Sequence, residues 1–171
     1  IFIFTFTKNN NKIKADPNKK IVIATKPSAE QLILGEILSL LIQENTDITV
    51  EKKFSIGGGT SNIHPALIKG EVDIYPEYTG TSWLFVLKQK QALESKEMYE
   101  KIKKEYEEKY KLEWLGLLGF NNTFSLSMKE ELANKYNIKT FSDLAKLSEQ
   151  FRFGAEFDFF EREDGFPGLK K

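Results

Sequence analysis

The sequence contains no cysteine and only one histidine. The absence of cysteine excludes disulfides, thiolate catalysis and cysteine-ligated metal sites, and it leaves the cellular compartment open. The single histidine, His64, stands beside Pro65 near the expected start of a helix, where we predict a surface or capping role. No nucleophile–base pair, metal cluster or phosphate loop stands out. The sequence therefore predicts no catalytic residue, no cofactor and no metal site.

The chain also has no net charge, because its 25 basic residues balance its 25 acidic residues. Nucleic-acid-binding domains usually carry a basic excess on one face, so this balance argues against nucleic acid as a partner. Of the 171 residues, 40% are hydrophobic and 29% are charged, as is usual for a protein with a packed core. This length allows one ordinary domain or slightly more.

A long hydrophobic run is missing from the start of the chain. Residues 1–7 are apolar, but a membrane-spanning helix needs about 20 such residues. The stretch fits the end of a signal peptide or of a preceding transmembrane helix, and it fits a disordered or vector-derived end equally well. Residues 8–20 are polar and show no apolar pattern, so we interpret residues 1–19 as a linker or tether.

The rest of the chain alternates between patterns typical of strands and of helices. Short apolar or alternating runs predict extended segments at residues 21–24, 47–54, 72–75, 112–118, 123–128 and 151–156. Helices are predicted after Ser28, after the glycines at 57–59, over residues 95–111, and from Lys129 and Ser142. Strands that alternate with helices indicate an α/β fold with a largely parallel sheet.

The helix after Ser28 is the most clearly marked. Ser28 and Gln31 match a capping box, in which the Gln31 side chain would reach back to the N-cap. Apolar residues follow on one face at helical spacing, at positions 32, 33, 37, 38, 41 and 42.

Sheet geometry indicates where a ligand would bind. In open α/β sheets, ligands bind beyond the carboxyl ends of the strands and near helix N-termini. Three segments fall at such positions, residues 25–31, 75–81 and 161–165.

These segments lie within four recognisable stretches: IVIATKPSAEQ (21–31), GGGTSNIHPALIKGEVDIYPEYTGT (57–81), LGLLGFNNTFSLSM (115–128) and FGAEFDFFEREDGFPGL (153–169). Through them, residues 20–169 resemble the extracytoplasmic binding proteins of ABC importers for glycine betaine, carnitine and choline. The strings DIYPEYTGT and EREDG at this spacing are together highly specific. The resemblance implies a periplasmic-binding-protein-like, two-lobed α/β fold, with residues 20–118 in the first lobe and 119–171 in the second.

The resemblance also implies which residues hold the ligand. Tyr78 and Phe124 would place aromatic rings around a quaternary ammonium group. The groups that would hold a ligand carboxylate are Lys26, Thr81 and Arg162. Gln31 and Asn122 would lie close by.

The chemistry of such a ligand agrees with these residue types. A trimethylammonium group has no N–H donor, so it is selected by aromatic faces, each of which contributes about 0.5–2 kcal/mol. Several rings are needed, because micromolar binding requires about 8 kcal/mol. An arginine fork can bind both oxygens of a carboxylate, and lysine supplies a point charge.

The sequence departs from the family in two respects. Relatives commonly have tyrosine at the position of Phe124, and phenylalanine keeps the ring face but loses the hydroxyl. The family's chain also continues well beyond Lys171, so we expect a C-terminal truncation, an incomplete second lobe and a missing part of the aromatic cage.

The implied function is that of a non-catalytic binding component. It would bind a quaternary ammonium compound outside the cytoplasm and deliver it to an ABC permease, which is either a separate subunit or fused to it. Membrane association would come through a tether or through the permease. Two alternatives stay open: a truncated fragment that binds weakly or not at all, and an enzyme on the same scaffold.

Four of the site residues also have a simpler interpretation. Gln31 could serve the capping box alone, and Lys26 could be solvated. Arg162 stands among acidic residues and could form a surface ion pair, while Tyr78 could be a packing ring in a turn. The triple glycine is better explained by backbone geometry than by anion binding, because it lacks the ending of a P-loop.

Overall fold

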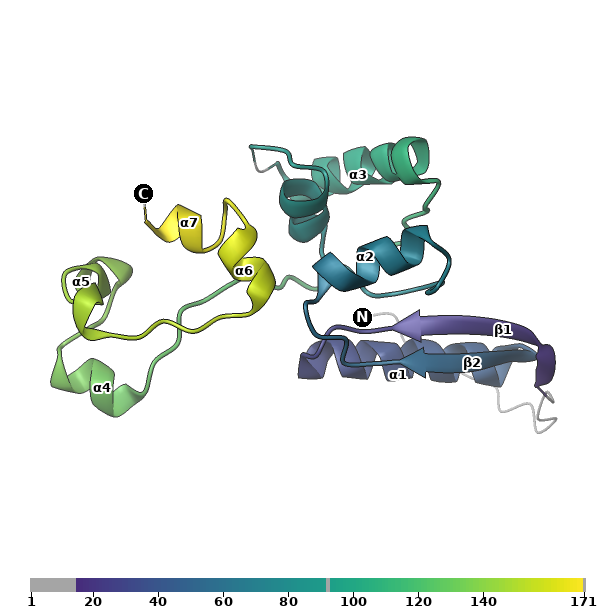
Figure 1. Cartoon of the computed structure of the whole chain (residues 1–171), viewed down its shortest axis with the longest axis horizontal. Helices are drawn as coiled ribbons and strands as arrows, with labels where there is room; N and C mark the ends of the chain where they lie inside the picture. The colour runs from purple at the N-terminus through teal and green to yellow at the C-terminus, as the bar shows by residue number, and fades with distance from the viewer. Residues whose placement is uncertain (1–14, 92, 171) are drawn as a thin grey trace. The chain divides into compact units, whose positions relative to one another are not determined.

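The computed structural model describes residues 15–91 and 93–170, and the chain divides into two compact units. The first unit contains the chain up to Trp114 together with the segment from Phe157 onwards (Figure 1). The second unit spans Leu115–Glu156. The predicted apolar end at residues 1–7 and most of the predicted tether lie outside the described residues.

The first unit is built on two parallel strands, β1 (Asp16–Ala24) and β2 (Ile48–Lys53). β1 begins five residues earlier than its predicted apolar run, so residues 16–19 belong to the strand and not to the tether. The polar start is held across the strand pair by surface ion pairs, because Lys19 contacts Asp47 at 2.5 Å and Lys20 contacts Glu51 at 2.7 Å. Ion pairs of this kind leave no apolar pattern in the sequence.

Helix α1 (Ala29–Asn45) connects the strands and lies alongside them (Figure 1). Its buried residues are small or polar: Gln31, Gly35 and Ser39. A Cβ atom at Gly35 would lie 2.4 Å from the Thr25 side chain, so the helix approaches the sheet too closely for larger residues. Much of its apolar face, including Ile33 and Ile37, is therefore exposed in the described part of the chain.

The strand predicted at residues 72–75 is reduced to a single parallel bridge between Ile23 and Ile74. The reason is a side chain: the Asp73 carboxylate accepts the Val22 N–H at 2.7 Å, so this donor is not available for a longer ladder. The bridge still brings the following loop beside the end of β1.

Three helical elements complete this part of the unit: α2 (Thr60–Ile68), the π-helical turn η1 (Thr81–Val86) and α3 (Ser95–Tyr110). One core cluster joins β1 to α2 through Val22, Ala24, Ile63 and Val72. A second cluster joins η1 to α3 through Trp83, Leu87, Met98, Ile102 and Tyr106. The predicted helical spacing of α3 is therefore confirmed, because its apolar side faces η1.

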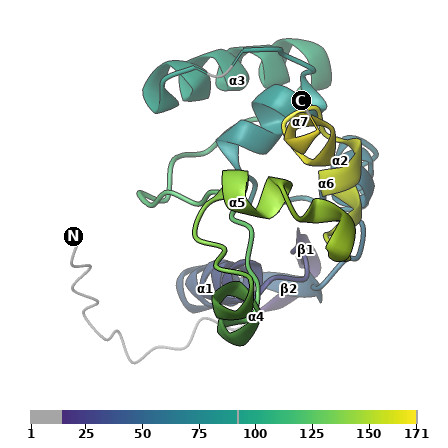
Figure 2. The same ribbon diagram turned by 90° about the vertical axis from the view of Figure 1, so that its left-hand side faces the viewer.

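The second unit contains α4 (Glu130–Lys135), α5 (Phe141–Ala145) and the short turn η2 (Ser148–Gln150) (Figure 2). Thr140 forms a capping box with Asp143, and α5 starts one residue before the predicted Ser142. The extended segments predicted at 112–118, 123–128 and 151–156 form no strand in the described chain. A strand forms only when its backbone pairs with a neighbouring strand, and no such pairing is assigned to these segments in the described chain.

Two short helices follow, α6 (Phe157–Glu161) and α7 (Phe166–Leu169), and both belong to the first unit. The turn between them requires Gly165, because a Cβ atom there would lie 2.2 Å from the Phe159 carbonyl oxygen. The division into two lobes between residues 118 and 119 remains a prediction.

Candidate ligand-binding site

A buried ion pair lies at the carboxyl end of β1. The Lys26 ammonium contacts Glu77 Oε1 at 2.5 Å, with side chains that are only 13% and 5% exposed. Glu77 Oε1 also accepts the Tyr78 backbone N–H at 2.7 Å, and Glu77 Oε2 accepts the Thr60 hydroxyl at 2.8 Å. Lys26 is therefore not a solvated surface residue. Glu77 joins the loop after β1, the start of α2 and the loop that carries Tyr78.

The Tyr78 side chain is held at both its ring and its hydroxyl. The Lys26 ammonium lies 4.9 Å from the ring centroid, a cation–π contact, and the hydroxyl donates to Glu30 at 2.5 Å. Partial burial, followed by the neighbouring Glu30 carboxylate, raises the pKa of Tyr78 above its ordinary value. The ring is thus a neutral π face at physiological pH, and it already contacts one cation.

Arg162 is buried, with a relative exposure of 4%, so it is not a surface residue. Its guanidinium forms a bidentate contact with Asp164, from Nε at 2.9 Å and from Nη2 at 2.6 Å. Nη1 donates to the Thr81 hydroxyl at 2.8 Å. Two residues that the resemblance assigned to a ligand carboxylate, Thr81 and Arg162, therefore lie in direct contact, although 81 positions separate them in the sequence.

Gln31 is fully buried and forms only half of the predicted capping box. Ser28 caps α1 by accepting the Gln31 N–H at 3.4 Å. The Gln31 side chain does not return to Ser28, because its oxygen accepts the Lys26 backbone N–H at 3.4 Å. The Nε2 atom has no hydrogen-bond partner among the residues described. Gln31 thus stabilises the loop that carries Lys26.

The N-terminus of α2 is capped from a distant part of the chain. The Asp158 carboxylate accepts the Thr60 N–H at 3.0 Å and the Ser61 hydroxyl at 2.6 Å. Gly59 provides the space, because a Cβ atom there would lie 2.9 Å from Asp158 Oδ2, and its φ of +52° favours glycine. The prediction that backbone geometry explains the glycines agrees with this arrangement. The helix N-terminus is occupied by a side-chain carboxylate.

Asn122 and Phe124 lie in the second unit, in a segment without helix or strand, and both are exposed. The first unit contains the other five predicted residues: Lys26, Gln31, Tyr78, Thr81 and Arg162. All seven assignments as ligand contacts remain predictions.

Sequence reasoning missed three carboxylates that organise the first unit's site: Glu30, Glu77 and Asp158. Glu77 stands inside the recognisable string PEYTGT, which is the one signal that could have indicated it. The contacts of Asp158 cross almost one hundred positions of sequence, so no local pattern predicts them.

His64 is buried, contrary to the predicted surface position, with a relative exposure of 7%. The reason is its place on the inner side of α2, where its ring centroid lies 5.4 Å from that of Tyr106 and 5.0 Å from that of Tyr110. Burial lowers the pKa of His64, and the negative charge of Glu77 opposes this shift.

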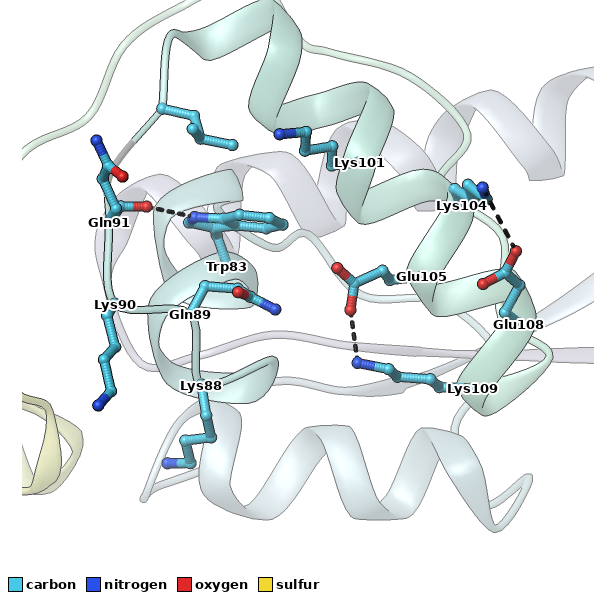
Figure 3. Close-up of a pocket in the computed structure, with 11 residues that line it drawn as sticks. Trp83, Lys88, Gln89, Lys90, Gln91, Lys101, Lys104, Glu105, Glu108 and Lys109 are labelled. Carbon is cyan, nitrogen blue, oxygen red and sulfur yellow. Dashed lines mark hydrogen bonds and ion pairs between the residues drawn. The ribbon is translucent and has the colours of Figure 1, made fainter.

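A separate groove of about 930 Å³ lies between α3 and the loop after η1 (Figure 3). Lysine side chains dominate its lining, but Lys109 pairs with Glu105 at 2.5 Å and Lys104 pairs with Glu108 at 3.9 Å. The Trp83 indole is fixed by a hydrogen bond of 2.7 Å to the Gln91 carbonyl. None of the seven predicted ligand residues lines this groove.

None of the helices in the part of the chain that the structure describes is both long and apolar enough to cross a membrane. Across residues 15–91 and 93–170, no group of histidine and acidic side chains is arranged to hold a metal ion.

Two proteins of known function are similar in sequence to this chain. The chain is 60% identical over 153 residues to the ergothioneine transport permease/ergothioneine binding protein EgtU of Helicobacter pylori (strain G27), covering 90% of this chain and 27% of that protein. It is 31% identical to the glycine betaine-binding protein YehZ of Escherichia coli (strain K12), covering 88% of this chain and 50% of that protein. This chain thus spans between about a quarter and a half of the length of these relatives.

The fold of this chain is also similar to that of a solved structure. The solved structure of apo YehZ from Escherichia coli superimposes with a TM-score of 0.56 at 31% sequence identity, covering 88% of this chain and 55% of that chain. The mixed α/β arrangement with a small parallel sheet is therefore shared over about half of that protein. Residues 19–171 match a family described as the substrate binding domain of ABC-type glycine betaine transport systems. Because this match covers most of the chain, the protein belongs to this family of substrate-binding domains.

Proposed function

We propose that this chain is the binding component of an ABC importer for zwitterionic quaternary ammonium compounds, with ergothioneine as the first candidate ligand. The observation that carries the proposal is the pairing of two side-chain groups in one unit. The Tyr78 ring contacts the Lys26 ammonium. Thr81, three residues after Tyr78, accepts a hydrogen bond from the buried Arg162. The unit thus holds an aromatic ring in contact with a cation and a buried guanidinium whose Nη1 faces Thr81.

Ergothioneine has the two charges that such groups select. It is a betaine of histidine, with a trimethylammonium and a carboxylate on the same carbon atom and a sulfur-bearing imidazole ring. The trimethylammonium cannot donate a hydrogen bond, so aromatic faces must bind it. We propose Tyr78 as one of these faces and Phe124 as another.

We propose that Arg162 and Thr81 bind the carboxylate. Asp164 holds the guanidinium in a fixed orientation through two contacts, so little conformational entropy is lost when a carboxylate binds. Lys26 would add a positive charge, and Gln31 and Asn122 would lie close by.

The 60% identity to an ergothioneine-binding relative supports ergothioneine, whereas the family's own description names glycine betaine. Glycine betaine carries the same two charges without the imidazole ring, so it is the second candidate. Carnitine and choline, which the resemblance also implied, complete the set of ligands to be tested.

We propose an ABC permease as the partner and a position outside the cytoplasm, because substrate-binding domains of importers capture their ligands there. The name of the Helicobacter pylori relative combines a transport permease with a binding protein, which supports a fused permease. We further propose that two lobes close over the ligand and that Asn122 and Phe124 contribute from the second lobe.

Isothermal titration calorimetry on the full gene product tests this function. We expect binding of ergothioneine in the micromolar range or tighter, with weaker binding of glycine betaine, carnitine and choline. Arg162→Ala should weaken ergothioneine binding at least about 30-fold, because the buried positive charge proposed to bind the ligand carboxylate is lost. The matched control is Arg152→Ala, at an exposed arginine of the second unit. Absence of binding for all four ligands would contradict the proposal.

A further inference from the structure

We infer that Glu77 is a positioning residue for ligand binding, which fixes the Lys26 ammonium so that it can receive the ligand's acidic end. This inference rests on the proposed function and adds to it a residue outside the predicted ligand set. The Glu77 carboxylate makes several contacts at once. Glu77 binds the Lys26 ammonium, the Thr60 hydroxyl and the Tyr78 backbone N–H, at distances from 2.5 to 2.8 Å.

The same carboxylate is shielded from solvent. The Glu77 side chain is 5% exposed, and a buried carboxylate is costly unless it is paired and hydrogen-bonded. The Lys26 ammonium meets this requirement from the end of β1. Removal of the lysine alone would leave a buried charge without its ion-pair partner, so the two residues should depend on each other.

The charge of Glu77 also acts on two buried tyrosines. Burial raises the pKa of Tyr75, and the Glu77 charge raises it further. Burial also raises the pKa of Tyr106, with Glu77 acting in the same direction. These directions agree with a charged Glu77 inside the unit.

The ion pair with Glu77 also orients the Lys26 ammonium. An ammonium has three N–H donors, and Glu77 Oε1 accepts from it at 2.5 Å. The same ammonium lies 4.9 Å from the Tyr78 ring, which is proposed to contact the ligand. Glu77 thus keeps a flexible lysine beside the ring, where its other N–H groups can meet a carboxylate.

A double-mutant cycle with Glu77→Gln and Lys26→Met tests the inference. Glutamine keeps the side-chain length and one acceptor oxygen but removes the charge. Affinity is measured by calorimetry on the full gene product with two probes, ergothioneine and its methyl ester, which lacks the carboxylate charge. The matched control is Glu51→Gln, which breaks an exposed ion pair with Lys20.

We expect Glu77→Gln to weaken ergothioneine binding about tenfold and to change methyl ester binding less than about twofold. The double variant should bind ergothioneine no more weakly than Lys26→Met alone. Additive losses, equal losses for both probes, or wild-type affinity in Glu77→Gln would overturn the inference.

Melting temperatures of the same variants separate this inference from the proposed function. We expect Lys26→Met to melt at a lower temperature than the double variant, because only the single variant leaves a buried carboxylate without its cation. If the wild-type protein bound neither ergothioneine nor glycine betaine, the proposed function would fail. The order of melting temperatures would still decide whether Glu77 and Lys26 form a coupled pair, and equal or reversed values would reject it.

Discussion

At the scale of single residues, Tyr78 connects the sequence to the proposed chemistry. Its ring contacts the Lys26 ammonium and its hydroxyl donates to Glu30, so the two parts of the side chain have separable roles. The ring would bind a cation, and the hydrogen bond would orient the ring.

Substitutions at Tyr78 can separate these roles. We expect Tyr78→Phe to keep ergothioneine affinity within about fivefold, because the π face remains, and Tyr78→Leu to lose about 30-fold or more. Calorimetry on the full gene product measures both. Equal losses in the two variants would show that the ring face does not carry the binding.

The backbone conformation at Gly59 restricts substitution. Its φ is +52°, and a Cβ atom would lie 2.9 Å from Asp158 Oδ2. We expect Gly59→Ala to lower the free energy of unfolding by about 1–3 kcal/mol. Gly57→Ala is the matched control, because no atom lies within 4 Å of its Cβ position and its φ is ordinary. Chemical denaturation of the two variants should separate them, and equal stabilities would contradict this explanation of the glycines.

The ligand roles of the seven candidate residues remain predictions, and their placement in the fold follows the local strings that carry them. Tyr78 and Thr81 lie in one string and Arg162 in another, and the first unit contains all three. Glu77 and Asp158 were missed because their importance comes from contacts with distant segments, which neither periodicity nor composition reveals.

At the scale of elements, helix prediction succeeded where one helix packs against one neighbour. The spacing predicted α3, whose apolar side meets η1. For α1 the helix was correct, but the buried face was not apolar, because the helix approaches the sheet through Gly35 and Ser39. Strand prediction failed for segments such as 151–156, since a strand exists only with a neighbour that the local sequence does not specify.

The capping of α2 gives a prediction at this scale. Gly59 has no side chain that could cap α2. The carboxylate of Asp158, a residue of α6, caps the helix instead. We expect Asp158→Ala to lower the free energy of unfolding by about 1–2 kcal/mol, the usual effect of losing an N-cap. Glu163→Ala, at an exposed carboxylate between α6 and α7, is the comparison. If Asp158→Ala were as stable as the wild type, the capping role would be wrong.

At the scale of the whole molecule, one buried titratable group links stability to pH. Burial lowers the pKa of His64 below its ordinary value of 6.5. As the pH falls below 6.5, the unfolded chain therefore binds a proton before the folded chain does, and the folded state loses stability. Above pH 6.5, both states are neutral at this residue and the effect vanishes.

We accordingly expect the melting temperature to fall between pH 7.5 and pH 5.0, and to fall less in His64→Phe, which keeps the ring packing against Tyr106 and Tyr110. The exposed carboxylates with lowered pKa values, Asp47, Glu51 and Asp143, lose their pairing at lower pH and should not contribute in this range. The same pH dependence in both proteins would exclude His64 as its source.

The proposed binding function depends on recognition of the methylated cation. Calorimetric titration of the full gene product with ergothioneine and with 2-thiohistidine, the same compound without its N-methyl groups, tests this most directly. We expect ergothioneine to bind and 2-thiohistidine to bind about 100-fold more weakly, because aromatic faces favour the trimethylammonium over a strongly hydrated ammonium. Equal affinities for the two compounds, or tighter binding of 2-thiohistidine, would contradict it.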